Sequence, residues 1–419
     1  MTAQTMTTGM TDRDIADLDA KDGLAGFRDQ FALPDGVIYL DGNSLGARPR
    51  RAAARIAEAV ESEWGNGLIT SWLGADWVNA PQRIGDKIAR LIGAGPSEVI
   101  ACDSTSVNIF KTLCAALSLN SSRSVILSEK TNFPTDVYMM QGIEAFTGKA
   151  VRAVTVDPDA LVDAIDDQVA VVLLTQVHYK SGRIRDMAEV TRKAHDKGAL
   201  IVWDLSHSAG AIPVDLNTSN ADFAVGCGYK FLNGGPGAPA FLFAASRHHG
   251  AALPVLSGWF GHRAPFDFTE DYQPSDGIAR FLCGTPPVLG LTALECGIDL
   301  FLEADMAMVR AKSQALGALF MERMAPLVAE YGFALVSPAD PAIRGSQVSY
   351  AHEQGYAIMQ ALKARGVIGD FRAPDVLRFG LTPLYLSHAD IARAVEILAD
   401  VMASRAWDRP EFRERAAVT

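Results

Sequence analysis

A lysine in a glycine-rich turn carries the strongest chemical signal in this sequence. Lys230 follows Gly226, Gly228 and Tyr229 at the end of an apolar run, and more glycines come after it. A lysine in such a turn can lie in a cleft with little crowding, where partial desolvation lowers its pKa and activates its amine toward carbonyl groups. Taken alone, the segment slightly favours a solvated loop lysine, because glycine-rich loops with lysine are common.

A carboxylate at the end of another apolar run could act together with this lysine. The segment 200–210 reads LIVWDLSHSAG, so Asp204 ends the run and His207 follows three residues later. In a parallel α/β sheet the C-terminal strand ends face the ligand crevice. A carboxylate there can keep a pyridine nitrogen protonated, which lets the ring act as an electron sink. A simple cap of the following turn is an equally good interpretation of Asp204.

The order of Asp204 and Lys230 along the chain indicates one class of cofactor. An aspartate at a strand end, followed 26 residues later by a lysine in a glycine-rich turn, is the order found in fold-type I pyridoxal-phosphate (PLP) enzymes. Such a cofactor needs a phosphate site, and Thr105 and Ser106 at the start of an amphipathic helix are the best candidates, because helix N-termini bind phosphate. Standing alone, the same residues are more typical of an N-cap.

The segment 131–136, TNFPTD, has two interpretations. Phe133 could lie flat against a pyridine ring, since aromatic faces stack. Alternatively, Pro134 and Asp136 could build a turn. The spacing of these residues does not decide between the two.

The elements that must position these residues alternate along the chain. Short apolar runs at 124–127, 169–174, 200–203 and 223–225 read as buried strands, and helical patterns cover 51–63, the stretch after Ser106, and 186–197. This alternation predicts an α/β fold with a mainly parallel sheet sandwiched by helices. From about Leu291 long helical patterns dominate, and Ser387 with Asp390 forms a capping box. The last ~120 residues therefore read as a smaller α+β domain.

Composition excludes several classes of protein. The 419 residues carry a net charge of −11, which disfavours nucleic acid and anionic membranes as partners. The five cysteines have no C-x-x-C spacing, so neither a disulfide framework nor a metal site is expected. No run reaches the ~18 apolar residues of a membrane helix, and the N-terminal 14 residues, which we expect to form a frayed tail, do not resemble a signal peptide. We therefore expect a cytoplasmic protein.

With these segments in place, the sequence resembles the kynureninase family over most of its length. The most specific matches are YLDGNSLG at 39–46 and GWFGH at 258–262. Further matches are NFPTD, QVHYKSGRI (176–184), WDLSHSAG, GCGYKFLNGGPG, FLCGTPP (281–287) and LRFGLTPLYLSHAD (377–390). The lysine and aspartate motifs alone would be shared with many aminotransferases and desulfurases.

The resemblance implies a PLP-dependent transferase fold of type I and three parts: an N-terminal arm (1–50) packing with the small domain, a large PLP-binding domain (51–300) and a small C-terminal domain (301–419). It also implies a role for each matching residue. Lys230 would form the Schiff base, Asp204 would pair with the ring nitrogen, and Arg378 would bind the substrate carboxylate in a bidentate pair. The remaining cofactor-binding residues implied are Thr105, Ser106, Phe133, Asp136, Thr175, His207 and Tyr229. Tyr229 would also donate a proton during catalysis.

The family resemblance further implies a homodimer whose active sites are shared, with Trp259 and Thr285 contributed by the neighbouring subunit. Without the resemblance, an exposed strand position would be the better interpretation of Arg378, and core packing that of Trp259.

The implied activity is the hydrolysis of L-kynurenine to anthranilate and L-alanine in tryptophan catabolism, on the kynurenine pathway that also supplies NAD biosynthesis. Family members that favour 3-hydroxykynurenine carry asparagine where Thr285 stands, and histidine in the loop that matches 64–72. This chain has neither, so 3-hydroxykynurenine is expected to be the poorer substrate.

The sequence leaves alternative functions open. A cysteine desulfurase or selenocysteine lyase of the same fold needs a reactive cysteine on a mobile loop well after the lysine, and neither Cys283 nor Cys296 is so placed. A simple aminotransferase is a second alternative. A binding protein on an inert enzyme fold would not need both Lys230 and Asp204. A nucleotide-binding protein is a further alternative, but this sequence has neither a G-x-x-x-x-G-K-[ST] motif nor a well-placed G-x-G-x-x-G motif to support it.

Overall fold

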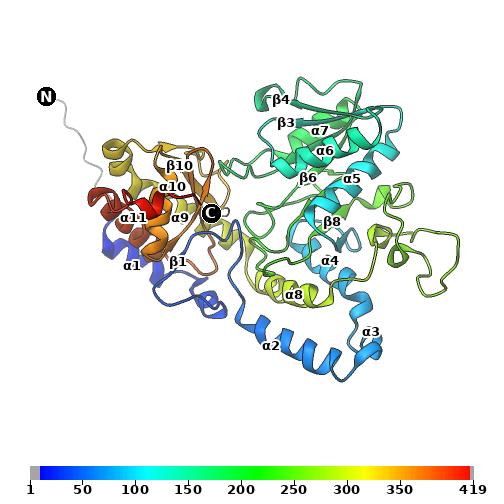
Figure 1. The fold of residues 1–419 in the computed structure, drawn as a ribbon, viewed down its shortest axis with the longest axis horizontal. Coiled ribbons are helices and arrows are strands. Elements are labelled where there is room, and N and C mark those ends of the chain that lie inside the picture. Colours follow the sequence, from blue (N-terminus) through cyan, green and yellow to red (C-terminus); the bar gives the residue numbers. More distant parts are fainter. Residues whose placement is uncertain (1–9, 416–419) are drawn as a thin grey trace. The chain divides into compact units, whose positions relative to one another are not determined.

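The computed structural model describes residues 10–415, which divide into two compact units. The larger unit comprises residues 48–179 and 184–306, and the smaller comprises residues 10–47, 180–183 and 307–415 (Figure 1). Most of the expected N-terminal tail lies outside the described residues. Within them that expectation is wrong from Thr11 onward, because Thr11 and Asp14 form a capping box that starts helix α1 (Asp12–Ala20).

A seven-stranded sheet forms the centre of the larger unit. Its strands, in spatial order, are β2 (Val99–Ala101), β8 (Phe241–Ala244), β7 (Phe223–Gly226), β6 (Leu200–Asp204), β5 (Val169–Thr175), β3 (Val125–Glu129) and β4 (Arg152–Val156). The five strands from β7 to β4 are parallel, while β8 is antiparallel to both of its neighbours. The expectation of a mainly parallel α/β sheet is confirmed.

Helices cover both faces of this sheet because its strands are apolar on both sides. Every residue of β5 is buried. Val171, Leu173 and Val202 belong to a core cluster that includes the buried face of α5 (Thr105–Leu119). Trp203 points to the opposite face, since side chains alternate along a strand, and its indole N–H donates to Thr191 of α7 (Met187–Asp196).

The helices of the larger unit begin and end with recognisable signals. Asp186 caps α7, and Gly198 follows it with a φ of +75°, as a C-terminal glycine should. Pro134 is the first residue of α6 (Pro134–Phe146), a position that suits proline because its missing N–H would be unpaired there anyway. The interpretation of TNFPTD as an isolated turn is therefore wrong.

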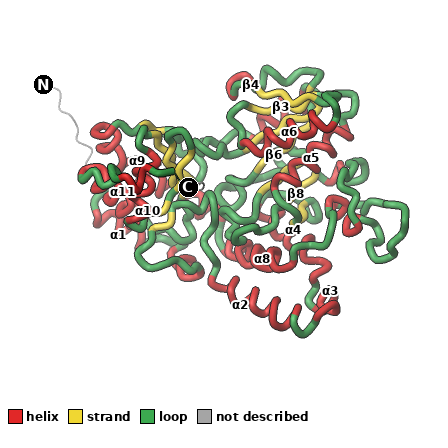
Figure 2. The backbone as a smooth tube through the Cα atoms, viewed as in Figure 1, coloured by secondary structure: helices red, strands yellow, loops and turns green. Residues whose placement is uncertain are grey.

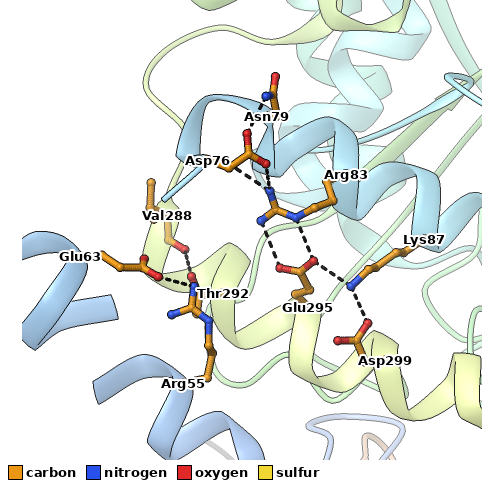
Figure 3. Close-up of polar contacts among 10 residues, drawn as sticks. All are labelled: Arg55, Glu63, Asp76, Asn79, Arg83, Lys87, Val288, Thr292, Glu295 and Asp299. Atoms are coloured by element: carbon orange, nitrogen blue, oxygen red, sulfur yellow. Dashed lines mark hydrogen bonds and ion pairs between the residues drawn. The ribbon is translucent and has the colours of Figure 1, made fainter. Parts of the chain in front are cut away.

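An ion-pair network joins helices α4 (Ala80–Leu91) and α8 (Val288–Glu303). Glu295 of α8 accepts from Arg83 at 3.0 Å and from Lys87 at 2.8 Å, and Lys87 also pairs with Asp299 at 2.6 Å (Figure 3). Beside them α2 (Arg50–Glu58) continues as a π-helical turn to Trp64, and Arg55 pairs with Glu63. The chain then passes through the short α3 (Ser71–Gly74).

Between β8 and α8 the chain is almost entirely loop (Figure 2). Residues 245–287 contain only three short 3₁₀ turns, one of which includes Trp259. Among the described residues, no helix is long and apolar enough to cross a membrane.

The smaller unit contains a four-stranded antiparallel sheet flanked by helices. Its strands, in spatial order, are β12 (Asp370–Arg372), β13 (Val376–Gly380), β10 (Gln347–Ala351) and β9 (Ala334–Leu335). Its main helices are α9 (Met306–Tyr331), α10 (Gly355–Ala364) and α11 (His388–Ala403), followed by the short α12 (Pro410–Arg413). The predicted capping box of Ser387 and Asp390 starts α11.

The N-terminal segment is part of this smaller unit. Strand β1 (Ile38–Tyr39) pairs in parallel with β11 (Val367–Ile368). The carboxylate of Asp19, at the end of α1, accepts from the backbone N–H groups of His388 and Ala389 at the start of α11. A buried ion pair of 2.6 Å also joins Asp22 to Lys312. In Figure 1 the blue and the orange-to-red segments of this unit accordingly lie together.

Candidate active site

The C-terminal ends of neighbouring parallel strands bring the candidate residues together. Thr175 and Asp204 are register partners at the ends of β5 and β6, and Asp204 in turn pairs with Val225 of β7. The turn after β7 then carries Lys230. These side chains line one cavity of about 90 Å³, as do all the other cofactor-site residues predicted within a single chain. The full lining is Thr105, Ser106, Phe133, Thr135, Asp136, Thr175, Tyr179, Asp204, Ser206, His207, Tyr229 and Lys230.

Lys230 is buried in this cavity rather than solvated. Its side chain is only 9% exposed, and its Nζ lies 3.1 Å from Nε2 of His207. The same Nζ lies 5.6 Å from the centre of the Phe133 ring and 5.9 Å from that of Tyr229. Because Lys230 lines the cavity, its amine can react with a small carbonyl compound that binds there. The alternative of a loop lysine in solvent is therefore wrong.

Two buried carboxylates share the cavity with Lys230. Burial raises the pKa of Asp204, against the opposing effects of a hydrogen bond from Ser206 and of the Lys230 charge. Burial also raises the pKa of Asp136 well above its usual range, and the charge of Asp204 raises it further. Two carboxylates that hinder each other's ionisation favour a cation placed beside them.

A chain of hydrogen bonds orients Asp136. The hydroxyl of Thr175 donates to the side-chain oxygen of Asn132 and lies 3.4 Å from Asp136 Oδ2. Asn132 donates in turn to Ser128, whose hydroxyl donates to the carbonyl of Leu173 at 2.7 Å. The cavity wall is therefore continuous with strands β3 and β5.

The start of α5 leaves donors for an anion. Ser104, and neither of the two predicted residues, is the N-cap, because its hydroxyl accepts from the N–H of Val107. The hydroxyls of Thr105 and Ser106 are thus not consumed by capping, and Thr105 Oγ1 is buried without a hydrogen-bond partner. A buried hydroxyl and a helix N-terminus that face one cavity form a site suited to phosphate.

Lys111 stabilises the turn that precedes α5. It is buried, its ammonium group is paired with Asp103, and it donates to the carbonyl of Phe281. The pairing holds the turn before α5 in place, where Asp103 adopts a positive φ of 48°. It also ties the 281–287 segment to that turn.

Trp259 and Thr285 do not line the Lys230 cavity of their own chain. Trp259 is 37% exposed and stacks on Phe268 at 6.2 Å in the loop region before α8. Thr285 lines a separate, larger hollow of about 520 Å³, together with Thr105 and Tyr229. A single chain therefore leaves their predicted contacts with the cofactor of a neighbouring subunit untested.

Arg378 belongs to the smaller unit. It lies on β13 and is 1% exposed, so the alternative of an exposed strand arginine is wrong. Its guanidinium is held by Asp370, with Nε donating to Oδ1 at 2.8 Å and Nη2 donating to Oδ2.

Three lining residues were not predicted from the sequence. Ser206 lies between Asp204 and His207, and Thr135 between Phe133 and Asp136, so both could have been found as neighbours of predicted residues. Tyr179 follows the end of β5, and its ring contacts Phe133 edge-on at 5.2 Å. Its position just beyond a parallel strand end was a usable signal.

Comparisons with known proteins agree with this arrangement. A protein-family model described as the kynureninase C-terminal domain matches residues 309–398. A curated kynureninase from Burkholderia mallei (strain SAVP1) is 51% identical over 407 residues, which cover 96% of this chain and 98% of the relative. A kynureninase from Pseudomonas fluorescens is 49% identical over 98% of this chain and 100% of its own.

Solved structures with lower identity share the fold. A cysteine desulfurase from Thermococcus onnurineus NA1 superposes with a TM-score of 0.76 at 18% identity, covering 90% of this chain and 98% of that chain. A variant of the lyase C-DES, in which glycine is covalently linked to the PLP cofactor, has a TM-score of 0.77 at 17% identity, covering 89% of this chain and 99% of that one. At these identities the likeness shows the fold alone.

Proposed function

The chain belongs to the kynureninase family, and on this premise we propose that it hydrolyses L-kynurenine to anthranilate and L-alanine with PLP bound at Lys230. The reaction adds one water across a side-chain carbon–carbon bond. The observation that carries the proposal is a single cavity that combines the buried Lys230 amine, the carboxylates of Asp204 and Asp136, and the start of α5.

The residues of this cavity fit PLP at both ends of the cofactor. A positively charged ring nitrogen would stabilise the charged forms of Asp136 and Asp204, which burial disfavours and, for Asp136, the charge of Asp204 disfavours further. A phosphate would give the unpartnered Thr105 hydroxyl its missing hydrogen bond. Lys230 would bind the aldehyde carbon. The other residues that would contact the cofactor are Phe133, Thr175, His207, Ser106 and Tyr229.

When bound, PLP supplies an electron sink for the electron pair that the substrate α-carbon gains as its proton leaves. The Nζ of Lys230 would accept that proton, so the lysine would act as a general base. Asp204 would pair with the ring nitrogen of the bound cofactor and keep it protonated. Tyr229 is the donor proposed for the later proton transfers, and Arg378 binds the substrate α-carboxylate.

A homodimer with shared active sites completes the proposal. Several large apolar side chains of the larger unit are exposed, and prominent among them are Ile69, Leu73 and Phe268, at 77%, 82% and 76%. Apolar surface of this kind is typical of interaction sites. We propose that Trp259 and Thr285 reach the cofactor of the partner subunit.

Substrate preference follows from two positions. Thr285 stands where asparagine would favour the 3-hydroxylated substrate, and the 64–72 loop has no histidine. We propose that kcat/KM is higher for L-kynurenine than for 3-hydroxykynurenine, which would suit a role in tryptophan catabolism. Measuring both substrates with one preparation tests this, and equal or reversed values would reject it.

The family also decides against the alternative of a desulfurase. Desulfurases share the fold, but the cysteines here are poorly placed for that chemistry. Cys296 is buried in α8, and the thiol of Cys283 faces the carbonyl of Leu256 at 3.7 Å, with its pKa raised by burial. A raised pKa leaves less of the nucleophilic thiolate at neutral pH.

We propose further that the three parts 1–50, 51–300 and 301–419 act as an arm, a PLP-binding domain and a small domain, and that the enzyme works in the cytoplasm. All five cysteines carry free thiols, which supports a reducing compartment.

The decisive test is the release of anthranilate, which is followed by its fluorescence. The wild-type enzyme with PLP should release one anthranilate and one alanine per L-kynurenine consumed. Lys230→Ala should abolish multiple turnover and should fail to form the coloured lysine adduct with PLP. Lys130→Ala, which removes an exposed lysine of the same unit, is the matched control and should retain both properties. Sustained turnover by Lys230→Ala would reject the assignment.

A further inference from the structure

The smaller unit contains a group of charged side chains around Arg378 that the family assignment does not explain. Arg378 and Asp370 are register partners on β13 and β12, so their side chains leave the sheet on the same face. Both are buried, with 1% and 2% of their side-chain surface exposed. A guanidinium removed from water in this way needs a partner that satisfies its charge and its geometry.

Asp370 is the charged partner of Arg378 and binds one edge of its guanidinium. Its two oxygens accept from Nε and Nη2 of Arg378, the bidentate geometry that fixes the plane of the fork. Ser44, in the turn after β1, adds a bridge: its hydroxyl donates to Asp370 Oδ2 at 2.6 Å and accepts from Arg378 Nη2 at 2.9 Å. Rotation about the end of the Arg378 side chain is therefore blocked from two directions.

Arg372 decides the charge of the group. Its Nη2 lies 2.8 Å from the same Oδ2 of Asp370 and also donates to Ser44. One carboxylate thus serves two guanidinium groups, which gives the group an excess of about one positive charge. Two further titratable side chains near Asp370, Asp41 and Tyr39, face the group, and burial together with Asp370 raises the pKa of both, that of Asp41 to about 7. At neutral pH Tyr39 is therefore uncharged and Asp41 is about half ionised, so the group keeps an excess of about half a positive charge.

We propose that Asp370, assisted by Ser44, is a positioning residue that orients Arg378 toward the α-carboxylate of the substrate, while Arg372 keeps the net charge of the group positive. The inference rests on the proposed role of Arg378 in substrate binding. It extends that role, because in a protein with a net charge of −11 the carboxylate of a substrate needs a local excess of positive charge.

The test separates recognition of the carboxylate from general damage. Asp370→Asn and Ser44→Ala are compared with the wild type on L-kynurenine and on the amine formed by its decarboxylation, whose binding is measured by competition. Asp370→Asn should raise KM for L-kynurenine by about 10- to 100-fold, as expected for loss of hydrogen bonds to a charged group. The affinity for the decarboxylated amine should change little, and Ser44→Ala should act in the same direction but less.

Two controls keep the outcomes distinct. Glu353→Gln removes an exposed carboxylate from the same unit and should leave both affinities unchanged. Arg378→Gln tests the premise: if it leaves KM unaltered, Arg378 does not bind the carboxylate, and the proposed role fails with it. If Arg378→Gln raises KM while a folded Asp370→Asn and Ser44→Ala do not, only the positioning role is rejected. If Asp370→Asn fails to fold, Ser44→Ala decides the question alone.

Discussion

Buried carboxylates lie both in the proposed cofactor site of the larger unit and in the Arg378 group of the smaller unit. In the larger unit Asp204 and Asp136 have raised pKa values, because burial penalises their charged forms. In the smaller unit Asp370 has a lowered pKa: burial opposes this, but Arg378 and Arg372 outweigh it. Asp204 and Asp136 thus suit a cation that a ligand would bring. Asp370, in contrast, is already paired with two arginines of the protein itself.

At the residue scale, Asp41 predicts a pH dependence of stability. Its pKa is raised from 3.8 to about 7 on folding, first by burial and then by the charge of Asp370. The folded protein therefore binds a proton more tightly than the unfolded chain, so this carboxyl lowers the free energy of unfolding as the pH rises from about 4 to about 7.

Asp41→Asn should remove this loss, because the amide imitates the neutral carboxyl. The variant should match the wild type near pH 4 and exceed its free energy of unfolding by a few kcal/mol near pH 8. Urea unfolding at both pH values measures the difference, with the exposed Asp35→Asn as the control. A difference between Asp41→Asn and the wild type that does not vary with pH would contradict the prediction.

At the scale of single elements, the start of α5 has one hydroxyl that caps the helix and another that can bind a ligand. Ser104 caps the helix, whereas the Thr105 hydroxyl is buried and has no partner. Neighbouring hydroxyls therefore have different functions: the first stabilises the helix, and the second is available to a ligand. The distinction arises because an N-cap residue must adopt an extended backbone, and Ser104 does so with a φ of −107° and a ψ of 162°.

Thr105→Val and Ser104→Ala should accordingly have opposite effects. Thr105→Val removes an unsatisfied buried hydroxyl, so the cofactor-free protein should keep or raise its Tm while its Kd for PLP rises by about 10-fold. Ser104→Ala should lower the free energy of unfolding by about 1 kcal/mol and change the Kd less. Thermal unfolding without cofactor and absorbance titration with PLP measure the two quantities. Equal destabilisation with unchanged PLP affinity would show that Thr105 has a structural role only.

At the scale of the whole molecule, the acidic charge and the exposed apolar side chains act in opposite directions. A net charge of −11 keeps copies of the chain apart at long range. The apolar side chains at Ile69, Leu73 and Phe268 favour close association of complementary surfaces. Self-association of this chain should therefore be specific, and salt should strengthen it by screening the repulsion.

Leu73→Asp should weaken the proposed dimer. A charge in a desolvated interface costs several kcal/mol unless it is paired, so the variant should sediment as a monomer at concentrations where the wild type is dimeric. Activity should fall together with the dimer if Trp259 and Thr285 act across subunits. Phe146→Asp is the matched control, since Phe146 is also an exposed apolar residue but lies on α6, far from α3 within the larger unit (Figure 1). If the wild type is monomeric and fully active, shared sites are excluded.

The order of the helices and strands, and the candidate catalytic residues that they carry, could be predicted from local patterns of residue types. Apolar runs and helix signals predicted strands β3, β5, β6 and β7, the helix covering Met187–Asp196 and the capping box of α11, because these features depend on neighbouring residues alone. The order of Asp204 and Lys230 along the chain, which is that of fold-type I PLP enzymes, predicted that the two residues act together. They do line one cavity, since parallel strands end at one edge of a sheet.

The burial of individual side chains and the identity of their contacts could be seen only in the folded chain. Arg378 is paired with Asp370, which belongs to a short strand that was not predicted from the sequence. Whether Lys230 is solvated, and whether Asp136 and Asp204 disfavour each other's charge, depends on desolvation and on distances between residues far apart in the chain. These quantities arise only when separate segments pack together, so a local pattern of residue types does not contain them.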